Sequence, residues 1–131
     1  MHLCRGNYKG RWLSQGGYDA IAERLFNETR VDVFLLEYDT ERAGDFVPLH
    51  HLPTGKRVHL GLISTKTPAM ESKADLCRSI EAAAHHTDLS QLGLCPQCGF
   101  ASTVGGNPLT IDDQRRKLSL VCEVVREVWG D

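Results

Sequence analysis

The sequence predicts an α/β fold with a parallel sheet, because strand patterns and helix patterns alternate along the chain. Nearly continuous apolar runs at 31–37 and 56–63 are typical of strands that are covered on both faces. Between such runs, apolar residues recur at helical spacing. The residues best suited to metal binding or proton transfer stand where the strands end, which favours one rim of a βα barrel.

The predicted elements follow in the order β-α-β-α-β-α-β-α. Strands are expected at 1–4, 31–37, 56–63 and 92–95, and helices at about 18–27, 40–49, 71–86 and from 111 onward. The last helix has the clearest pattern, because Thr110 can cap it and Asp112 and Asp113 lie at the positive end of its dipole. Its expected buried stripe comprises Leu118, Val121, Cys122, Val125, Val128 and Trp129.

The spacing of the strand ends matches a barrel of eight βα units. A barrel of about 250 residues gives roughly 31 residues to each unit. Cys4 and Glu37 are 33 positions apart, and Glu37 and Cys98 are 61 apart, close to one and two units. We therefore expect residues 1–131 to form one domain, half of a (βα)8 TIM barrel, with a doubly wound sheet as the alternative. Because a candidate ligand already stands at residue 2, the chain is expected to be part of something larger.

Composition excludes several classes of function. With 15 basic and 17 acidic residues the net charge is −2, and no basic stripe indicates nucleic-acid binding. No apolar run is long enough to cross a bilayer, and no secretory signal pattern opens the chain. Five cysteines, an odd number, favour a reducing compartment in which thiols bind metal or pack in the core. We therefore expect a cytoplasmic protein.

Four residues form a candidate zinc site. His2 and Cys4 are two apart on a predicted strand, so that both side chains point to the same face. Cys98 lies in the turn after the last strand, and a thiolate–imidazole–carboxylate set suits Zn²⁺. Glu37 ends an apolar run and needs a cation, either a metal or Arg42. The alternatives for the thiols are a redox Cys-x-x-Cys pair, core packing, or half of a four-thiolate zinc knuckle, which the absence of a second Cys-x-x-Cys disfavours.

Other polar residues have weaker patterns. Lys66 follows the third predicted strand on the same rim, where it either contributes a cation or proton to the site or is solvated. Cys95 ends the last strand and is expected to pack in the core rather than bind metal. The remaining cysteines and the histidine pairs are expected to be core residues and solvated helix ends: Cys77, Cys122, His50, His51, His85 and His86.

Six stretches together resemble the C-terminal catalytic domain of the cobalamin-independent methionine synthase family. They are HLCRGNYKGRW, GGYDAIAERLFNE, VFLLEYDTERAGDF, LGLISTKTP, PQCGFAST and KLSLVCEVVREVWG, and they cover essentially the whole chain. The resemblance is greatest to the short single-domain relatives. It implies the last four units of a zinc-bearing (βα)8 barrel, with zinc held by His2, Cys4, Glu37 and Cys98. The family's zinc activates the thiol of homocysteine, which takes a methyl group to give methionine.

The resemblance leaves the methyl donor and acceptor open. Lys66 stands where the folate-using synthases have a histidine thought to protonate the departing folate, so either methyltetrahydrofolate or a methylated corrinoid protein fits as donor. An alternative is zinc-dependent alkyl transfer to another thiol such as coenzyme M. A second alternative is a catalytically inactive half-barrel that dimerises through its open edges. We expect the isolated chain to bind zinc weakly and to need a second half for turnover.

Overall fold

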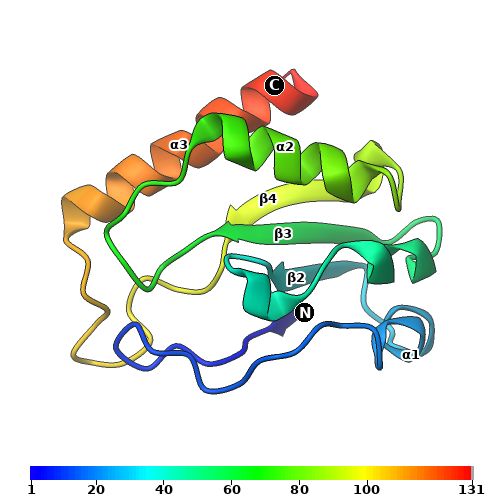
Figure 1. Ribbon diagram of the computed structural model, residues 1–131, viewed down its shortest axis with the longest axis horizontal. Helices are drawn as coiled ribbons and strands as arrows, with labels where there is room; N and C mark the ends of the chain where they lie inside the picture. The colour runs from blue at the N-terminus through cyan, green and yellow to red at the C-terminus, as the bar shows by residue number, and fades with distance from the viewer. Residues whose placement is uncertain (131) are drawn as a thin grey trace.

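Four parallel strands form one sheet in the order in which they occur in the chain (Figure 1). Strand β1 spans His2–Leu3, β2 spans Val33–Glu37, β3 spans Arg57–Ile63 and β4 spans Leu92–Pro96. This computed structural model describes residues 1–130. The predicted parallel α/β class is confirmed.

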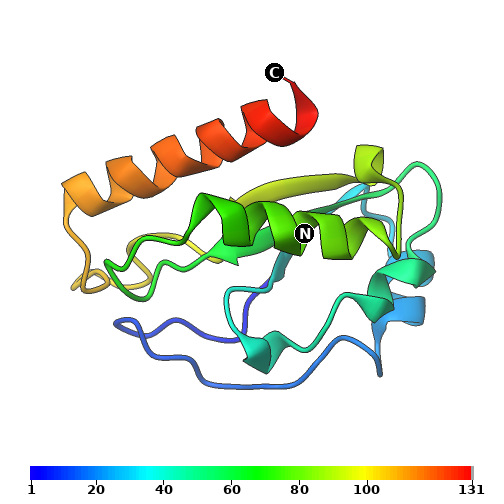
Figure 2. The same ribbon diagram turned by 45° about the horizontal axis from the view of Figure 1, so that its top comes forward.

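Three α-helices connect or follow the strands: α1 at Ala22–Glu28, α2 at Lys73–Ala84 and α3 at Ile111–Trp129. Helices α2 and α3 lie side by side on one side of the sheet in both views (Figures 1 and 2). No helix within residues 1–130 combines the length and the apolar character that crossing a membrane would require. As predicted, Thr110 caps α3, and Asp113 completes a capping box with it.

One face of the sheet carries the core. The strand register places Phe34, Val58 and Leu92 side by side, and all three are buried. The ring of Phe34 meets the ring of Phe26 on α1 edge to face, with centroids 5.1 Å apart. A sequential strand order with crossovers of one hand puts all the helices on one face, whereas a doubly wound sheet has helices on both. The arrangement is consistent with a section of a βα barrel.

The segment after β2 differs from the predicted helix over 40–49. It forms two short 3₁₀ helices, η1 at Glu41–Ala43 and η2 at Val47–His51. Gly44 follows η1 with φ 79° and ψ −162°, a positive-φ conformation that interrupts the helix and that glycine adopts without strain. The helix expected from residue 18 likewise begins only at Ala22, because residues before it form a turn around Tyr18.

The buried face of α3 agrees with the predicted stripe in part, because Val121, Val125, Val128 and Trp129 pack against the core as expected. Leu118 is 40% exposed and Cys122 is exposed, whereas Leu120 and Val124 are buried. Lys117 is also fully buried, because its amine reaches Glu71 before α2. Lys117, Leu120 and Val124 therefore share the inner face of α3.

Candidate metal centre

Three of the predicted ligands meet at one point of the structure. A ring nitrogen of His2 and the sulfur atoms of Cys4 and Cys98 all lie within 4.8 Å of one another. His2 and Cys4 are exposed and Cys98 is half-buried, so a cation could reach them from solvent. All five cysteines of the chain are free thiols.

The convergence depends on the curvature of the sheet and on the loop after β4. β1 and β4 are opposite edges of the sheet, and two strands lie between them. In a flat sheet such edges would stand about 14 Å apart, at about 4.8 Å per strand. The sulfur atoms of Cys4 and Cys98 are nevertheless only 3.8 Å apart.

The donor set fits zinc. Two sulfur atoms bound at about 2.3 Å to a tetrahedral Zn²⁺ ion lie about 3.8 Å from each other. The observed separation of the Cys4 and Cys98 sulfurs is 3.8 Å. One imidazole and two thiols are also the ligand types that zinc prefers over magnesium or calcium. Burial raises the pKa of Cys98, and the neighbouring Cys4 and Glu37 raise it further, so a cation at this position would be needed to favour its thiolate.

Glu37 lies beside this group, but its carboxylate is held by other residues. Its Oε1 accepts hydrogen bonds from Arg42 Nη2 at 2.7 Å and from Lys66 Nζ at 3.2 Å. Its Oε2 accepts from the backbone N–H of Arg5 at 3.1 Å and from Gln97 Nε2 at 2.8 Å. Burial alone would raise the pKa of Glu37, but these donors lower it below its ordinary value. Of the two partners considered for Glu37, the structure shows Arg42, and Glu37 is not among the residues whose ligand atoms converge.

Lys66 is on the predicted rim, but its amine is buried rather than solvated. Its side chain is 6% exposed and forms ion pairs with Glu37 and, at 2.9 Å, with Asp39 Oδ2. Two carboxylates and two cations thus form one buried cluster, composed of Glu37, Asp39, Arg42 and Lys66. We call it the ion-pair cluster.

Sequence reasoning missed the polar side chains that support Glu37 from neighbouring loops. Gln97 is buried and its Oε1 accepts a hydrogen bond from Thr65 Oγ1 at 3.0 Å. Asn7 donates to Thr65 Oγ1 at 2.9 Å and to Gln97 Oε1 at 3.4 Å. Gly61 lies on β3, and its lack of a side chain lets the neighbouring β2 lie close to it. A Cβ atom at this position would stand 2.8 Å from the carbonyl oxygen of Leu36. The feature of the sequence that could have pointed to Gln97 is its position between Cys95 and Cys98.

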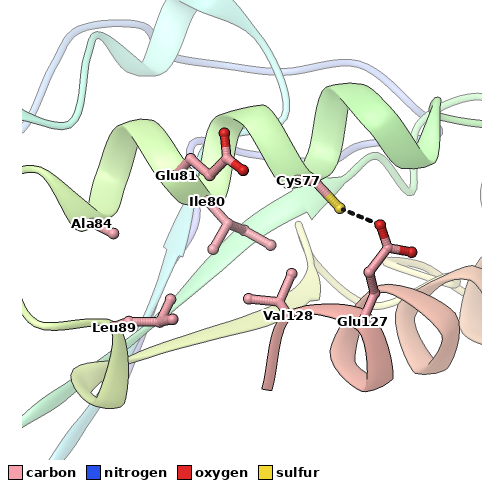
Figure 3. A pocket seen from close by; sticks show the side chains of 7 residues that line it. All are labelled: Cys77, Ile80, Glu81, Ala84, Leu89, Glu127 and Val128. Atoms are coloured by element: carbon pink, nitrogen blue, oxygen red, sulfur yellow. Dashed lines mark hydrogen bonds between the residues drawn. The ribbon is translucent and has the colours of Figure 1, made fainter. Parts of the chain in front are cut away.

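Cys95 and Cys77 are not among the ligands that converge. Burial raises the pKa of the Cys95 thiol to about 12, and its sulfur lies 3.7 Å from the carbonyl oxygen of His59. Cys77 lines a groove of about 300 Å³ between α2 and α3, where Figure 3 shows it beside Glu127 and near the apolar Ile80 and Val128. Glu127 also pairs with Lys73, and Glu81 lines the same groove.

A second hollow adjoins the candidate ligands. It has a volume of about 280 Å³ and lies on the face of the sheet opposite the helices. Its lining comes from the ends of β1 and β4 and from β2, namely His2, Leu35, Cys95, Pro96, Cys98 and Gly99. A small molecule in this hollow would contact two of the three candidate ligands.

Two proteins of Bacillus subtilis (strain 168) are similar in sequence over 130 residues. They are the uncharacterized proteins YxjG, at 45% identity, and YxjH, at 44% identity. Each match covers 98% of this chain and 34% of the relative. The chain thus spans about a third of the length of the curated relatives it matches. No protein-family model matches the chain.

Two solved structures share the fold. One, from Listeria monocytogenes, is named a "Putative Vitamin-B12 Independent Methionine Synthase"; it has 32% identity and a TM-score of 0.73, covering 100% of this chain and 35% of that one. The other is a B12-independent methionine synthase from Shewanella sp. W3-18-1 in complex with selenomethionine. It has 23% identity and a TM-score of 0.73, covering 96% of this chain and 38% of the other, and it bears on the fold alone. The structural neighbours are thus methionine synthase-like proteins, as the sequence motifs predicted.

Proposed function

We propose that this chain is the zinc-binding half of a (βα)8 barrel that transfers a methyl group to the thiol of homocysteine, forming methionine. The observation that carries the proposal is the convergence of His2, Cys4 and Cys98 on one point at the carboxyl end of a parallel sheet. Barrel enzymes keep their reactive groups at this end of their strands. The methionine synthase-like neighbours support the same reaction class.

His2, Cys4 and Cys98 would hold the zinc, with Glu37 as the fourth ligand. When bound, zinc lowers the pKa of a coordinated thiol so that it is a thiolate near neutral pH. The hollow beside His2 and Cys98 gives the acceptor thiol access to these ligands. Leu35 and Pro96 line it with apolar surface, against which the carbon chain of an acceptor thiol can pack.

Lys66 is proposed as the residue that meets negative charge or supplies a proton on the donor side. In the structure its amine pairs with Glu37 and Asp39, so it also holds the Glu37 carboxylate within the ion-pair cluster. Methyltetrahydrofolate and a methylated corrinoid protein are both proposed donors, and the reaction test includes both.

The uncovered face of the sheet is the proposed contact with the rest of a barrel. Here the register aligns His2, Leu35 and His59, which are exposed or half-buried, in contrast to the buried opposite face. A second half supplied by another polypeptide or by a second copy of this chain would cover it. The mass of the chain in size-exclusion chromatography with light scattering distinguishes a monomer from a dimer.

Zinc binding is tested by competition with a chromophoric chelator under reducing conditions. We expect one zinc ion per chain, lost when Cys4 or Cys98 is changed to serine. A chain that binds no zinc, or that keeps it in the Cys4→Ser, Cys98→Ser double variant, would contradict the proposed centre.

Methyl transfer is tested in a barrel, by putting this chain in place of the segment of YxjG that it matches. The chimera is given homocysteine with either methyltetrahydrofolate or methylcobalamin, and methionine is measured by mass spectrometry. Coenzyme M replaces homocysteine in a parallel reaction. We expect methionine from one donor, and none from the Cys98→Ser chimera. A chimera that binds zinc but methylates only coenzyme M, or neither thiol, would refute homocysteine as the acceptor.

A further inference from the structure

Only one of the two carboxylate oxygens of Asp39 accepts a hydrogen bond within the described residues. Its side chain is completely buried, and Oδ2 accepts a hydrogen bond from Lys66 Nζ at 2.9 Å. Among the described residues, Oδ1 has no hydrogen-bond partner. The nearest cation to it is Arg42, whose Nη2 stands 3.8 Å away. Buried polar atoms are almost always paired, so this unpaired oxygen calls for an explanation.

Arg42 and Lys66 at present keep Glu37 from the candidate metal centre. Both donate to Glu37 Oε1, and the opposite oxygen accepts from Arg5 and Gln97. If Glu37 turns toward a metal, these two cations lose one of the two carboxylates that neutralise them. A buried cation without a partner is costly, so the exchange needs another acceptor close by.

We propose that Asp39 is this acceptor: Arg42 moves from Glu37 to the unpaired oxygen of Asp39, and Glu37 is thereby released to join His2, Cys4 and Cys98. The proposal rests on the zinc centre proposed above. Arg42 Nη2 is 2.7 Å from Glu37 Oε1 and 3.8 Å from Asp39 Oδ1. A movement on the order of 1 Å brings it within hydrogen-bond distance of Asp39. Lys66 already contacts both carboxylates and can stay with Asp39.

The alternative is that Asp39 only stabilises the fold by neutralising Lys66. In that case Asp39→Asn lowers the free energy of unfolding but leaves the ligands of a bound metal unchanged. The exchange requires a change in metal affinity and in the ligand set. Asp39 is therefore a positioning residue, which does not itself touch the metal.

The experiment is a titration of the full chain with Co²⁺ alone, under reducing conditions, followed by its visible absorption, which reports how many thiolate and oxygen ligands bind the ion. Asp39→Asn leaves Arg42 and Lys66 with Glu37 as their only carboxylate, so we expect Co²⁺ affinity to fall by about tenfold or more, the equivalent of about 1.4 kcal/mol. Its spectrum should match that of Glu37→Gln. Glu41→Gln is the control, because it removes an exposed carboxylate two residues further along the chain.

A second pair of variants tests the charge balance. Lys66→Met removes one cation that competes for Glu37, so Co²⁺ should bind more tightly than in the parent. Adding Lys66→Met to Asp39→Asn should recover part of the lost affinity, which a purely structural role of Asp39 would not allow. If circular dichroism shows Asp39→Asn to be unfolded, the double variant is compared with Lys66→Met: weaker Co²⁺ binding by the double variant supports the exchange, and equal binding overturns it.

Failure of the centre and failure of the exchange give different results. A parent chain that takes up no Co²⁺ overturns the proposed zinc centre, and the exchange with it. A parent that binds Co²⁺ while Asp39→Asn binds it equally, with an unchanged spectrum, overturns the exchange alone.

Discussion

Lys117 on α3 donates hydrogen bonds to both carboxylate oxygens of Glu71, at 3.1 and 3.0 Å, across 46 residues of sequence. The lysine side chain has no exposed surface, and its amine also donates to the carbonyl oxygen of Ala69. Glu71 in turn accepts a hydrogen bond from the backbone N–H of Ser64, just after β3. One buried ion pair therefore joins α3 to the loop between β3 and α2.

Glu71→Ala should destabilise the fold strongly, because it leaves the Lys117 amine buried without an anion. Breaking one side of a buried pair costs about 3 kcal/mol or more. The measurement is urea unfolding followed by circular dichroism. Glu81→Ala, on the exposed side of α2, is the matched control and should change the free energy of unfolding by less than about 0.5 kcal/mol. Equal effects of the two variants would show that the Lys117 pair is unimportant.

Leu120 and Leu118 provide a test of which face of α3 packs on the sheet. Leu120 is 7% exposed and Leu118 is 40% exposed. Leu120→Ala should lower the free energy of unfolding by about 2–4 kcal/mol, since it opens a cavity in the core. Leu118→Ala removes the same atoms from the surface and should cost far less. The reverse order of the two effects would favour the stripe expected from sequence.

The case of α3 shows what a hydrophobic pattern can and cannot predict. The helix and its cap at Thr110 followed from local signals within a few residues. The burial of Lys117 did not, because a lysine counts as polar in any pattern and this one is paired with Glu71 inside the fold. A partner 46 residues away leaves no periodic trace in the sequence.

The candidate centre was predictable to a similar extent. His2 and Cys4 are neighbours on one strand, and Cys98 stands in a recognisable turn, so residue type and strand order could place them together. The ion-pair cluster is different, because Asp39 and Lys66 meet only through the packing of two loops. Arg42, five residues after Glu37, was close enough in sequence to be named as a partner.

The capping box of α3 should make stability depend on pH in acid. Hydrogen bonds from the backbone and side chain of Thr110 lower the pKa of Asp113 from 3.8 to about 2. A carboxyl whose pKa is lower in the folded state contributes stability above pH 3.8, and this contribution is lost as the pH falls toward 2. Asp113→Asn should therefore flatten the loss of stability over this range. The measurement is urea unfolding at several pH values, with Asp112→Asn as the control; a parent and variant with parallel pH profiles would contradict this role of Asp113.

Replacing Cys98 should weaken zinc binding far more than replacing Cys95, although only two residues lie between them. The Cys98 sulfur is 3.8 Å from that of Cys4, whereas burial raises the pKa of Cys95 to about 12 and keeps it a neutral thiol. Cys98→Ser should weaken zinc binding by more than the roughly 100-fold that loss of a partner outside the coordination sphere can cost. Cys95→Ser should leave the affinity within a few fold of the parent, because its thiol is not among the group that converges with His2. Chelator competition measures both, and loss of zinc in Cys95→Ser with retention in Cys98→Ser would assign the ligand to the other cysteine and move the centre toward the end of β4.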